Sequence, residues 1–350
     1  MKKLNQIFFA VKNKNDEIRL NSSSGGAFNA LATYIIKNGG VVYGAIYDWN
    51  FNIIHKRIDK LEDIYMLQGS KYSNSNMASI INQLKKDAEN NVKVLFSGTP
   101  CQIKAVKNIL SGYNINNFLF VDIICRGTPN KYFFDDYKKM MEKRFNSKLV
   151  CINMRHKDKK EFYQNIKYVN PCYKEKIGKH SMFLKFDNGK EYFMPSCLDV
   201  FYLNFDYFMN NSCFQCKFSN MNRLSDITIG DFHQFNCNLG TFNDCNGVSL
   251  VILNSQNGLD FFNCVRNNFE YLEKSEEEIY QPALYAPAEK PRNYNEFQSD
   301  YKKFGFDFVI KKYTPISIKY KLKVLLYRIG LYEKIKKVKM SIGEKNENKD

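Results

Sequence analysis

The spacing of hydrophobic positions changes along the chain, and the changes predict the order of helices and strands. In "SSSGGAFNALATYIIKNGG" these positions recur every three to four residues. This predicts a helix that one of the three serines caps and that Asn38 and Gly39 end. The apolar run of residues 41–48, "VVYGAIYD", predicts a strand, and "MASIINQLKKDAE" predicts a second helix.

Two units of similar pattern follow. "VKVLF", "SGTP" and "CQIKAVKNIL" predict a buried strand, a turn and a helix, and "FLFVDII", "CRGTP" and "NKYFFDDYKKMMEKRF" repeat that order. Short, continuously apolar strands that alternate with helices indicate parallel β-α-β organisation. Gly-Thr-Pro occurs in both turns, at 98–100 and 127–129, and we expect each proline near the first helical position, where no N–H is needed.

The pattern changes beyond residue 150, where stretches become short and rich in Tyr and Lys, with weak strands such as "SMFLKF". "GVSLVILN" then predicts a strand and "GLDFFNCVRNNF" a helix. The fold class that follows is α/β: a parallel-sheet core with helices on both faces, a smaller cysteine-containing α+β region and a basic helical C-terminal tail.

Charge and cysteine content narrow the function classes. The net charge is +16, and residues 301–350 hold fourteen Lys or Arg against five Asp or Glu. This tail predicts a pair of basic amphipathic helices that contact anionic lipid or a partner, the alternative being a solvated helical face. No stacking motif indicates nucleic acid, and no apolar run approaches the roughly 18 residues of a membrane span. Without a signal-like N-terminus we expect a cytoplasmic chain, whose ten cysteines serve metal or redox chemistry rather than disulfides.

Four cysteines have a setting that suits a shared ligand. Cys101 follows one predicted parallel strand and Cys125 ends the next, so both lie at the sheet edge where ligands bind in α/β folds. Cys213 and Cys216 form a C-x-x-C pair that can turn both thiolates toward one metal. The four suit either a zinc site or a 4Fe-4S cluster. The other six cysteines have no comparable setting, and Cys264, on an apolar helix, is expected in the core.

Two loops could hold a phosphate group, although no G-x-G-x-x-G follows any strand. "SSSGG" precedes a helix N-terminus and offers hydroxyls and close backbone approach, the alternative being an ordinary N-cap. "GSKYSNS" places Lys71 beside a glycine and several hydroxyls, the alternative being a surface loop.

Six ordered blocks give a more specific indication. "SSSGGAF", "GGVVYGA", "LQGSKY", "VLFSGTPCQI", "VDIICRGTP" and "CFQCKF", the last followed by "SDITIGDF", resemble the beta subunits of coenzyme F-420 hydrogenases and dehydrogenases. The resemblance covers about residues 10–255. It implies an FAD site, a 4Fe-4S cluster on Cys101, Cys125, Cys213 and Cys216, and hydride or electron transfer to a substrate. The residues expected to bind FAD are Ser22, Ser23, Ser24, Gly25, Gly26, Gly69, Ser70, Lys71, Tyr72, Gly98 and Thr99.

The same resemblance suggests a division of the chain into domains. Residues 1–88 would form an α/β region with the flavin loops. Residues 89–285 would form a domain like the C-terminal part of those beta subunits, with the cysteine cluster, and residues 286–350 the basic tail.

The chain departs from the family pattern near the substrate side. It has no ferredoxin-like segment of close cysteines before Cys101, so we expect a ferredoxin or another redox partner protein to supply any second cluster. Arg126 stands where relatives usually carry histidine, and His233 where they carry tryptophan. Together with Asp231, these two are the candidate catalytic residues.

The function expected from the sequence is that of an iron–sulfur flavoprotein oxidoreductase acting on a small anionic substrate. Bacterial relatives that resemble components of surface-polysaccharide loci suggest a sugar intermediate as substrate, with the basic tail docking the chain at the inner membrane face. The alternative is a non-redox component of such an assembly, either zinc-stapled or free of cofactor.

Overall fold

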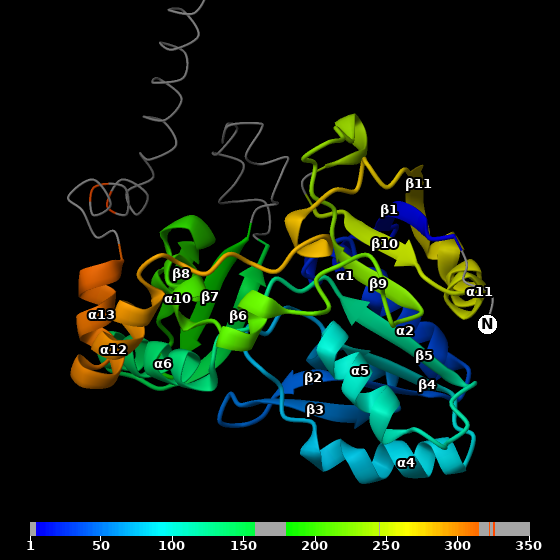
Figure 1. The fold of residues 1–350 in the computed structure, drawn as a ribbon, viewed down its shortest axis with the longest axis horizontal. Helices are drawn as coiled ribbons and strands as arrows, with labels where there is room; N and C mark the ends of the chain where they lie inside the picture. Colours follow the sequence, from blue (N-terminus) through cyan, green and yellow to red (C-terminus); the bar gives the residue numbers. More distant parts are fainter. Residues whose placement is uncertain (1–4, 158–179, 245, 315–321, 323–324, 326–350) are drawn as a thin grey trace, which may run out of the picture.

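The computed structural model describes residues 5–157, 180–244, 246–314, 322 and 325. A mixed sheet of eight strands forms the larger part of the molecule (Figure 1). Its strands, in spatial order, are β11 (Phe269–Lys274), β1 (Ile7–Asn13), β10 (Ser249–Leu253), β9 (Ile227–Asp231), β5 (Phe118–Ile123), β4 (Val94–Gly98), β2 (Val41–Tyr47) and β3 (Ile53–Ile58).

The centre of this sheet is parallel, as the sequence predicts. The pairs β2–β4, β4–β5 and β5–β9 are parallel, whereas β3 at one edge and β10, β1 and β11 at the other pair antiparallel. The antiparallel side arises because the N-terminal strand β1 inserts between two late strands, with Ile7 opposite Leu253. The sheet therefore draws strands from both ends of the chain.

Helices cover both faces of the sheet. Side chains of α2 (Ala27–Lys37) and α11 (Gln256–Val265) pack on one face against Val42, Leu95 and Leu119. On the other face, α4 (Ile81–Glu89) and α5 (Pro100–Ile109) pack against the alternate positions Tyr43 and Phe96. Successive residues of a strand point to opposite faces, so the continuous apolar runs in the sequence supply both cores. The shorter helices on this side of the molecule are α1 (Asp16–Leu20), α3 (Ile64–Leu67), η1 (Leu61–Asp63), η2 (Ala78–Ile80) and η6 (Arg266–Asn268).

A second region, beside the large sheet in Figure 1, has its own aromatic core. Its antiparallel sheet orders β6 (Leu149–His156), β7 (Ser181–Phe186) and β8 (Glu191–Pro195). Phe133 lies at the centre of this core, stacked 4.5 Å from Phe201 and 4.0 Å from Phe208 between ring centroids. The helices here are α6 (Lys131–Phe145), α9 (Val200–Leu203), α10 (Phe205–Phe208), α12 (Tyr294–Phe304), α13 (Phe306–Tyr313) and η3 (Ser196–Leu198).

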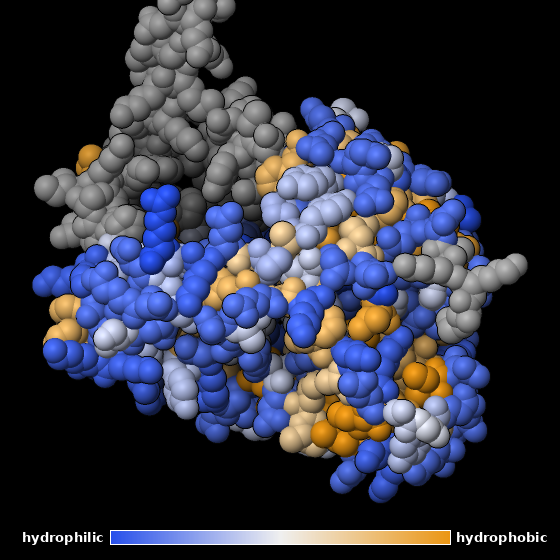
Figure 2. Space-filling view, in the orientation of Figure 1, coloured by the Kyte–Doolittle hydropathy of each residue, from blue (hydrophilic) through white to orange (hydrophobic). Residues whose placement is uncertain are grey.

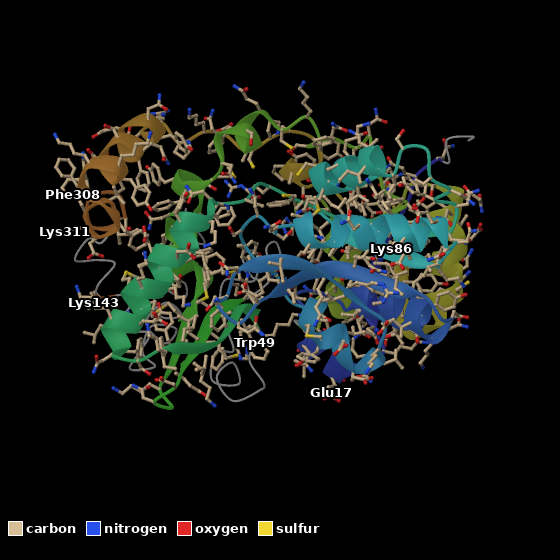
Figure 3. The ribbon with its side chains drawn as sticks, turned by 90° about the horizontal axis from the view of Figure 1, so that it is seen from below. Glu17, Trp49, Lys86, Lys143, Phe308 and Lys311 are labelled. Carbon is tan, nitrogen blue, oxygen red and sulfur yellow. The ribbon has the colours of Figure 1, made fainter. Side chains whose placement is uncertain are left out.

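Further 3-10 turns lie in loops: η4 (Asn211–Gln215) before β9, η5 (Gly240–Phe242) between β9 and β10, and η7 (Pro282–Leu284) after β11. Of the basic helices expected at 318–340, the described residues include Leu322 and Leu325, which are both exposed. Helix α13, which is described, has basic residues in its last turn, where Lys311 lies beside Phe308 (Figure 3). Trp49, in the turn between β2 and β3, is fully exposed (Figure 3).

The outer surface is largely hydrophilic on the face drawn in Figure 2, with smaller hydrophobic patches between the polar side chains. Among the described residues, no helix has both the length and the apolar character needed to cross a membrane. The expected fold class is confirmed in its parallel core and in its helices on both faces.

One predicted cap is wrong. The helix N-cap of α2 is Gly26, with φ of 85°, and no serine side chain caps it. The serine hydroxyls are used elsewhere, since Ser22 donates to the Ile18 carbonyl at 2.7 Å and Ser24 to that of Val248 at 2.7 Å. The predicted end of this helix at Asn38 and Gly39 is confirmed.

Candidate functional site

The carboxyl ends of the parallel strands bring the sequence-predicted residues to one edge of the sheet. Cys101 follows β4, Cys125 follows β5, and Asp231 is the last residue of β9. These three strands are neighbours in the sheet. Loops after the carboxyl ends of parallel strands are the usual position of ligand sites in open α/β folds.

The four predicted cysteine ligands converge at this edge. Burial is the largest cause that raises the pKa of the Cys125 thiol, to about 12, and the nearby thiols of Cys101, Cys213 and Cys216 raise it further. The N–H of Gly127 donates to Cys125 and partly opposes the rise. Cys101 is exposed and the other three are half-buried. Three thiols from two other segments of the chain therefore lie near the thiol of Cys125.

The turns around these cysteines are tightly held. Thr99 Oγ1 lies 3.1 Å from Cys101 Sγ, in the first turn of α5. A Cβ built on Gly127 would lie 3.2 Å from Cys213 Cβ, so the turn after Cys125 directly contacts the loop of the C-x-x-C pair. The Cys213 N–H donates to the Asn210 carbonyl at 2.9 Å, within the turn that presents the pair.

Four cysteine thiolates are a usual donor set of a 4Fe-4S cluster and also of a zinc site. The part of the chain that the structure describes holds no group of three or more His, Cys, Asp or Glu close enough to share one metal ion. A four-iron cluster is larger than one ion and needs its four thiolates further apart, and cysteine thiolates are its usual ligands. The four cysteines therefore fit a 4Fe-4S cluster in type and number.

A buried ion pair fastens the C-x-x-C loop to the strand that carries Cys125. Arg223, in the loop after Cys216, lies 2.9 Å from the Asp122 carboxylate of β5, and both side chains are almost fully buried. Burial raises the pKa of Asp122, and the guanidinium of Arg223 opposes the rise. Arg223 also donates to Thr228 Oγ1 at 3.2 Å, which links the loop to β9 as well.

The two loops predicted to bind FAD lie side by side. Ser23 Oγ is 2.9 Å from Ser70 Oγ. Gly25 packs so closely that a Cβ would lie 2.3 Å from the Val11 carbonyl oxygen, which explains the glycine. Gly69 has φ of 80°. Gly98 and Thr99, expected in the same site, lie beside Cys101 at the end of β4.

Lys71 and Tyr72, also expected to bind FAD, directly follow Gly69 and Ser70 in the second loop. Lys71 Nζ donates to the carbonyls of Gln68 at 2.7 Å and Gly69 at 3.1 Å, and burial lowers the pKa of Lys71 to about 7. Its ammonium lies 5.8 Å from the ring centroid of Tyr47, at the end of β2. The hydroxyl of Tyr47 is buried and has no hydrogen-bond partner within the described chain.

A buried polar cluster joins these loops to the candidate catalytic residues. Arg155, at the end of β6, pairs with Asp231 at 2.5 Å and donates to the Tyr72 hydroxyl at 3.3 Å. Burial disfavours both charges, but the pair more than offsets this, so the pKa of Arg155 is raised and that of Asp231 lowered.

Two histidines flank the ion pair. Burial lowers the pKa of His180 to about 3, and Arg155 lowers it further. Burial also lowers the pKa of His233, with Asp231 opposing. The Nδ1 atoms of both rings are buried and without a hydrogen-bond partner among the described residues. Both are therefore neutral near pH 7.

Arg126 does not belong to this cluster. It is exposed and pairs with Asp206 at 2.7 Å. The three candidate catalytic residues are thus divided, with Asp231 and His233 together at the end of β9 and Arg126 beside Cys125. Cys264, expected in the core, is exposed on α11.

Sequence reasoning missed several members of the cluster. Arg155 and His180 lie in stretches whose charge suggests exposure, and His55, in a similar stretch, is only 1% exposed. Lys157 donates to the carbonyls of Arg19, Ser24 and Asn246, and burial lowers its pKa to about 7. One signal was available, because Arg155 and Lys157 are two residues apart at the end of a strand and therefore share a face.

Comparison with known proteins gives the family and the fold of the chain. A family model that describes the C terminus of the beta subunit of coenzyme F420 hydrogenase/dehydrogenase matches residues 91–278. No curated protein sequence matches. Among solved structures, a chain of the F420-reducing NiFe hydrogenase complex from Methanosarcina barkeri, in a xenon derivative, has a TM-score of 0.50 at 18% identity. The similarity covers 80% of this chain and 85% of that chain, and it supports the fold alone. Because the family model spans more than half of the sequence and all four cysteines, the chain belongs to the coenzyme F420 hydrogenase/dehydrogenase beta-subunit family.

Proposed function

We propose that this chain, a member of a family of hydrogenase-subunit-like redox proteins, is an iron–sulfur flavoprotein oxidoreductase. The observation that carries the proposal is the convergence of four cysteines from three segments at the ligand-binding edge of the sheet. When bound, a 4Fe-4S cluster supplies single electrons and FAD supplies hydride or electron transfer. The rest of the proposal concerns what the chain's own residues do.

Cys101, Cys125, Cys213 and Cys216 would hold the cluster as thiolates. Burial without a cation favours the neutral thiol of Cys125, so iron and the loss of its proton would be coupled at that residue. The Asp122–Arg223 pair keeps the C-x-x-C loop against β5, and the turn at Gly127 keeps it against Cys125.

The loops at residues 22–26 and 69–72 would hold FAD. Lys71 uses two of its three N–H donors on carbonyls, which leaves one for a phosphate or the flavin ring. The buried and unpartnered hydroxyl of Tyr47 lies beside it. Buried polar atoms usually have partners, and a bound ligand would supply one here.

The cluster of Asp231, His233 and Arg155 would form the substrate side. His233 is neutral near pH 7, so its Nδ1 could accept a proton from the substrate or return one. Asp231 and Arg155 would set the charge beside the His233 ring. Lys71, which keeps one free N–H, would favour a small anionic substrate in its protonated form, and a sugar intermediate of surface polysaccharide would meet that description.

The solved relative is part of a hydrogenase complex, which supports a redox partner protein in general. We propose that a ferredoxin or a similar protein exchanges electrons with the cluster at the exposed Cys101. We place this activity in the cytoplasm, with contact to the inner membrane face through the basic C-terminal residues.

Anaerobic purification followed by a visible spectrum and by iron, sulfide, zinc and flavin analysis tests the proposal. We expect a broad shoulder near roughly 400 nm, about four irons per chain and released FAD. Cys213→Ser should abolish the iron signal, whereas the matched control Cys264→Ser, on an exposed helix face far from the four ligands in sequence, should retain it. A colourless wild-type protein with one zinc, or with no metal, would contradict the proposal and favour a non-redox binding component.

A further inference from the structure

Residues 73–76, "SNSN", directly follow the 69–72 loop and form an extended segment beside the edge strand β3. The His55 N–H donates to the Asn76 carbonyl at 2.8 Å, and the Asn76 N–H donates to the Ile53 carbonyl at 2.9 Å. This pairing fixes the segment to the large sheet. The side chains of Ser73, Asn74 and Ser75 contact the turns that carry the cysteines or the first residues of α5, the helix that contains Cys101.

Ser75 connects the segment to the turn before Cys101. Gln102 Nε2 donates to Ser75 Oγ at 2.7 Å, and Gln102 Oε1 accepts the Thr99 N–H at 2.9 Å. His55 Nε2 lies 3.0 Å from the Ser97 carbonyl and must donate to it, so His55 Nδ1 accepts from Ser75 Oγ at 2.8 Å. Every polar atom in this series of hydrogen bonds then has a donor or acceptor of the right kind.

Asn74 and Ser73 connect the segment to the turn after Cys125. The Thr128 hydroxyl donates to Asn74 Oδ1, and the Ser73 hydroxyl lies 3.5 Å from the Pro129 carbonyl. Ser73 is buried, so this side of the segment is packed as well as hydrogen-bonded.

Thr128 extends the connection to the third turn. Its carbonyl accepts from both the N–H of Asn210 at 3.0 Å and the side-chain amide of Asn210 at 3.0 Å. The Asn210 carbonyl in turn accepts the Cys213 N–H at 2.9 Å. A continuous series of contacts therefore runs from the Cys101 turn, through residues 73–76, to Cys213.

From these contacts we infer that residues 73–76 are a positioning segment that sets the spacing of the three cysteine-bearing turns. None of its side chains is a cluster ligand, and it acts through Gln102, Thr128 and Asn210. Because it continues directly from residues 69–72, it also fixes the cysteines relative to the proposed flavin loop. Its role for a cluster rests on the proposed function, whereas its effect on the thiols does not.

The test compares the double variant Asn74→Ala/Ser75→Ala with the matched control Ser111→Ala/Asn114→Ala, which removes the same side chains from an exposed loop. In protein prepared without metal, we expect iodoacetamide to alkylate the half-buried Cys125 and Cys213 about fivefold faster in the variant. Mass spectrometry gives the rates, with exposed Cys264 as the internal reference. In protein purified with iron, we expect release to a chelator to be about tenfold faster than in the control.

The outcomes separate the two ideas. Alkylation at the control rate overturns the positioning role, and so does faster alkylation with unchanged release of bound iron. If no preparation binds iron, the cluster proposal fails and the alkylation rates alone decide the positioning role. The single variant Ser75→Thr keeps the hydroxyl, so its rates of alkylation and iron release should equal those of wild type. Should the double variant misfold by circular dichroism, Ser75→Ala alone is the milder substitute, with the same expected direction.

Discussion

The same tripeptide, Gly-Thr-Pro, occurs beside two of the predicted cluster ligands and has a different structure in each place. At residues 98–100 it begins a helix: Thr99 is the N-cap of α5, Pro100 is its first residue, and Cys101 follows. At residues 127–129 it follows Cys125, and α6 begins only at Lys131, with Asn130 as its N-cap. The expected place of proline is confirmed at Pro100, whereas Pro129 lies outside its helix.

This difference shows that the tripeptide does not determine the environment of the thiol. In the first turn the chain closes on itself, because Gln102 reaches back to the Thr99 N–H. In the second, Gly127 packs against Met209 and Cys213, and Thr128 bonds to Asn210 and Asn74. Cys101 is consequently exposed and Cys125 half-buried. The first turn is closed by its own residue Gln102 and additionally held by Ser75, whereas the second is built from contacts between distant segments.

The largest effect should come from the ion pair that only the second turn has. Arg223→Ala would leave the Asp122 carboxylate buried without its partner, and we expect a loss of about 3–5 kcal/mol in the free energy of unfolding. Urea titration of the purified protein measures this. The control is Arg126→Ala, which breaks an exposed pair and should cost about 1 kcal/mol or less. Similar losses in the two variants would show that the buried pair does not fasten the C-x-x-C loop.

The turn before Cys101 should make the stability of the protein sensitive to acid, because His55 bonds to it. Burial lowers the pKa of His55 to about 4, against about 6.5 when unfolded. Between these values the folded state binds fewer protons, so stability is full above about pH 6.5 and falls by about 3 kcal/mol as the pH drops to 4. Protonated Nδ1 could no longer accept from Ser75.

Urea titrations at several pH values, in wild type and His55→Gln, isolate this contribution from His180 and His233. Between pH 6.5 and 4, the free energy of unfolding should fall by about 3 kcal/mol less in the variant than in wild type, because glutamine does not titrate. A wild-type slope that the variant reproduces would mean that His55 is not buried in the neutral form.

Much of the sheet could be predicted because the sequence patterns that specify its parallel strands are local. The apolar runs that form β2, β4 and β5 and the periodic helices α2 and α5 can each be read within about a dozen residues. The antiparallel half could not, because β1 pairs with β10 across more than two hundred residues and no local pattern specifies that partner.

The site divides in the same way. The four cysteines could be selected because strand ends and a C-x-x-C spacing are sequence features, and Ser23 and Ser70 because small and polar residues cluster in their loops. Arg155 and His180 could not, because a buried charge looks like a solvated one until its partner is known. Asp231 supplies that partner from a strand more than seventy residues away.

The smallest predicted effect tests the contrast between the turns directly, since each contains one glycine. A Cβ on Gly127 would lie 2.0 Å from Met209 Sδ, and φ there is 148°, a conformation that alanine rarely adopts. A Cβ on Gly98 would lie 3.0 Å from Gln102 Oε1, the end of a flexible side chain. We therefore expect Gly127→Ala to cost about 2–3 kcal/mol in the free energy of unfolding and Gly98→Ala about 1 kcal/mol.

Urea titration measures the free energy of unfolding of both variants, and iodoacetamide alkylation measures how accessible Cys213 is in each. Gly127→Ala should push Met209 and the C-x-x-C loop outward and expose Cys213, whereas Gly98→Ala should leave the Cys213 rate unchanged. The two readouts must move together, because the same clash causes both. Equal stability losses with unchanged alkylation would mean that both turns are locally closed. The thiols would then owe their convergence to the strands alone, and the contacts between the turns would be incidental.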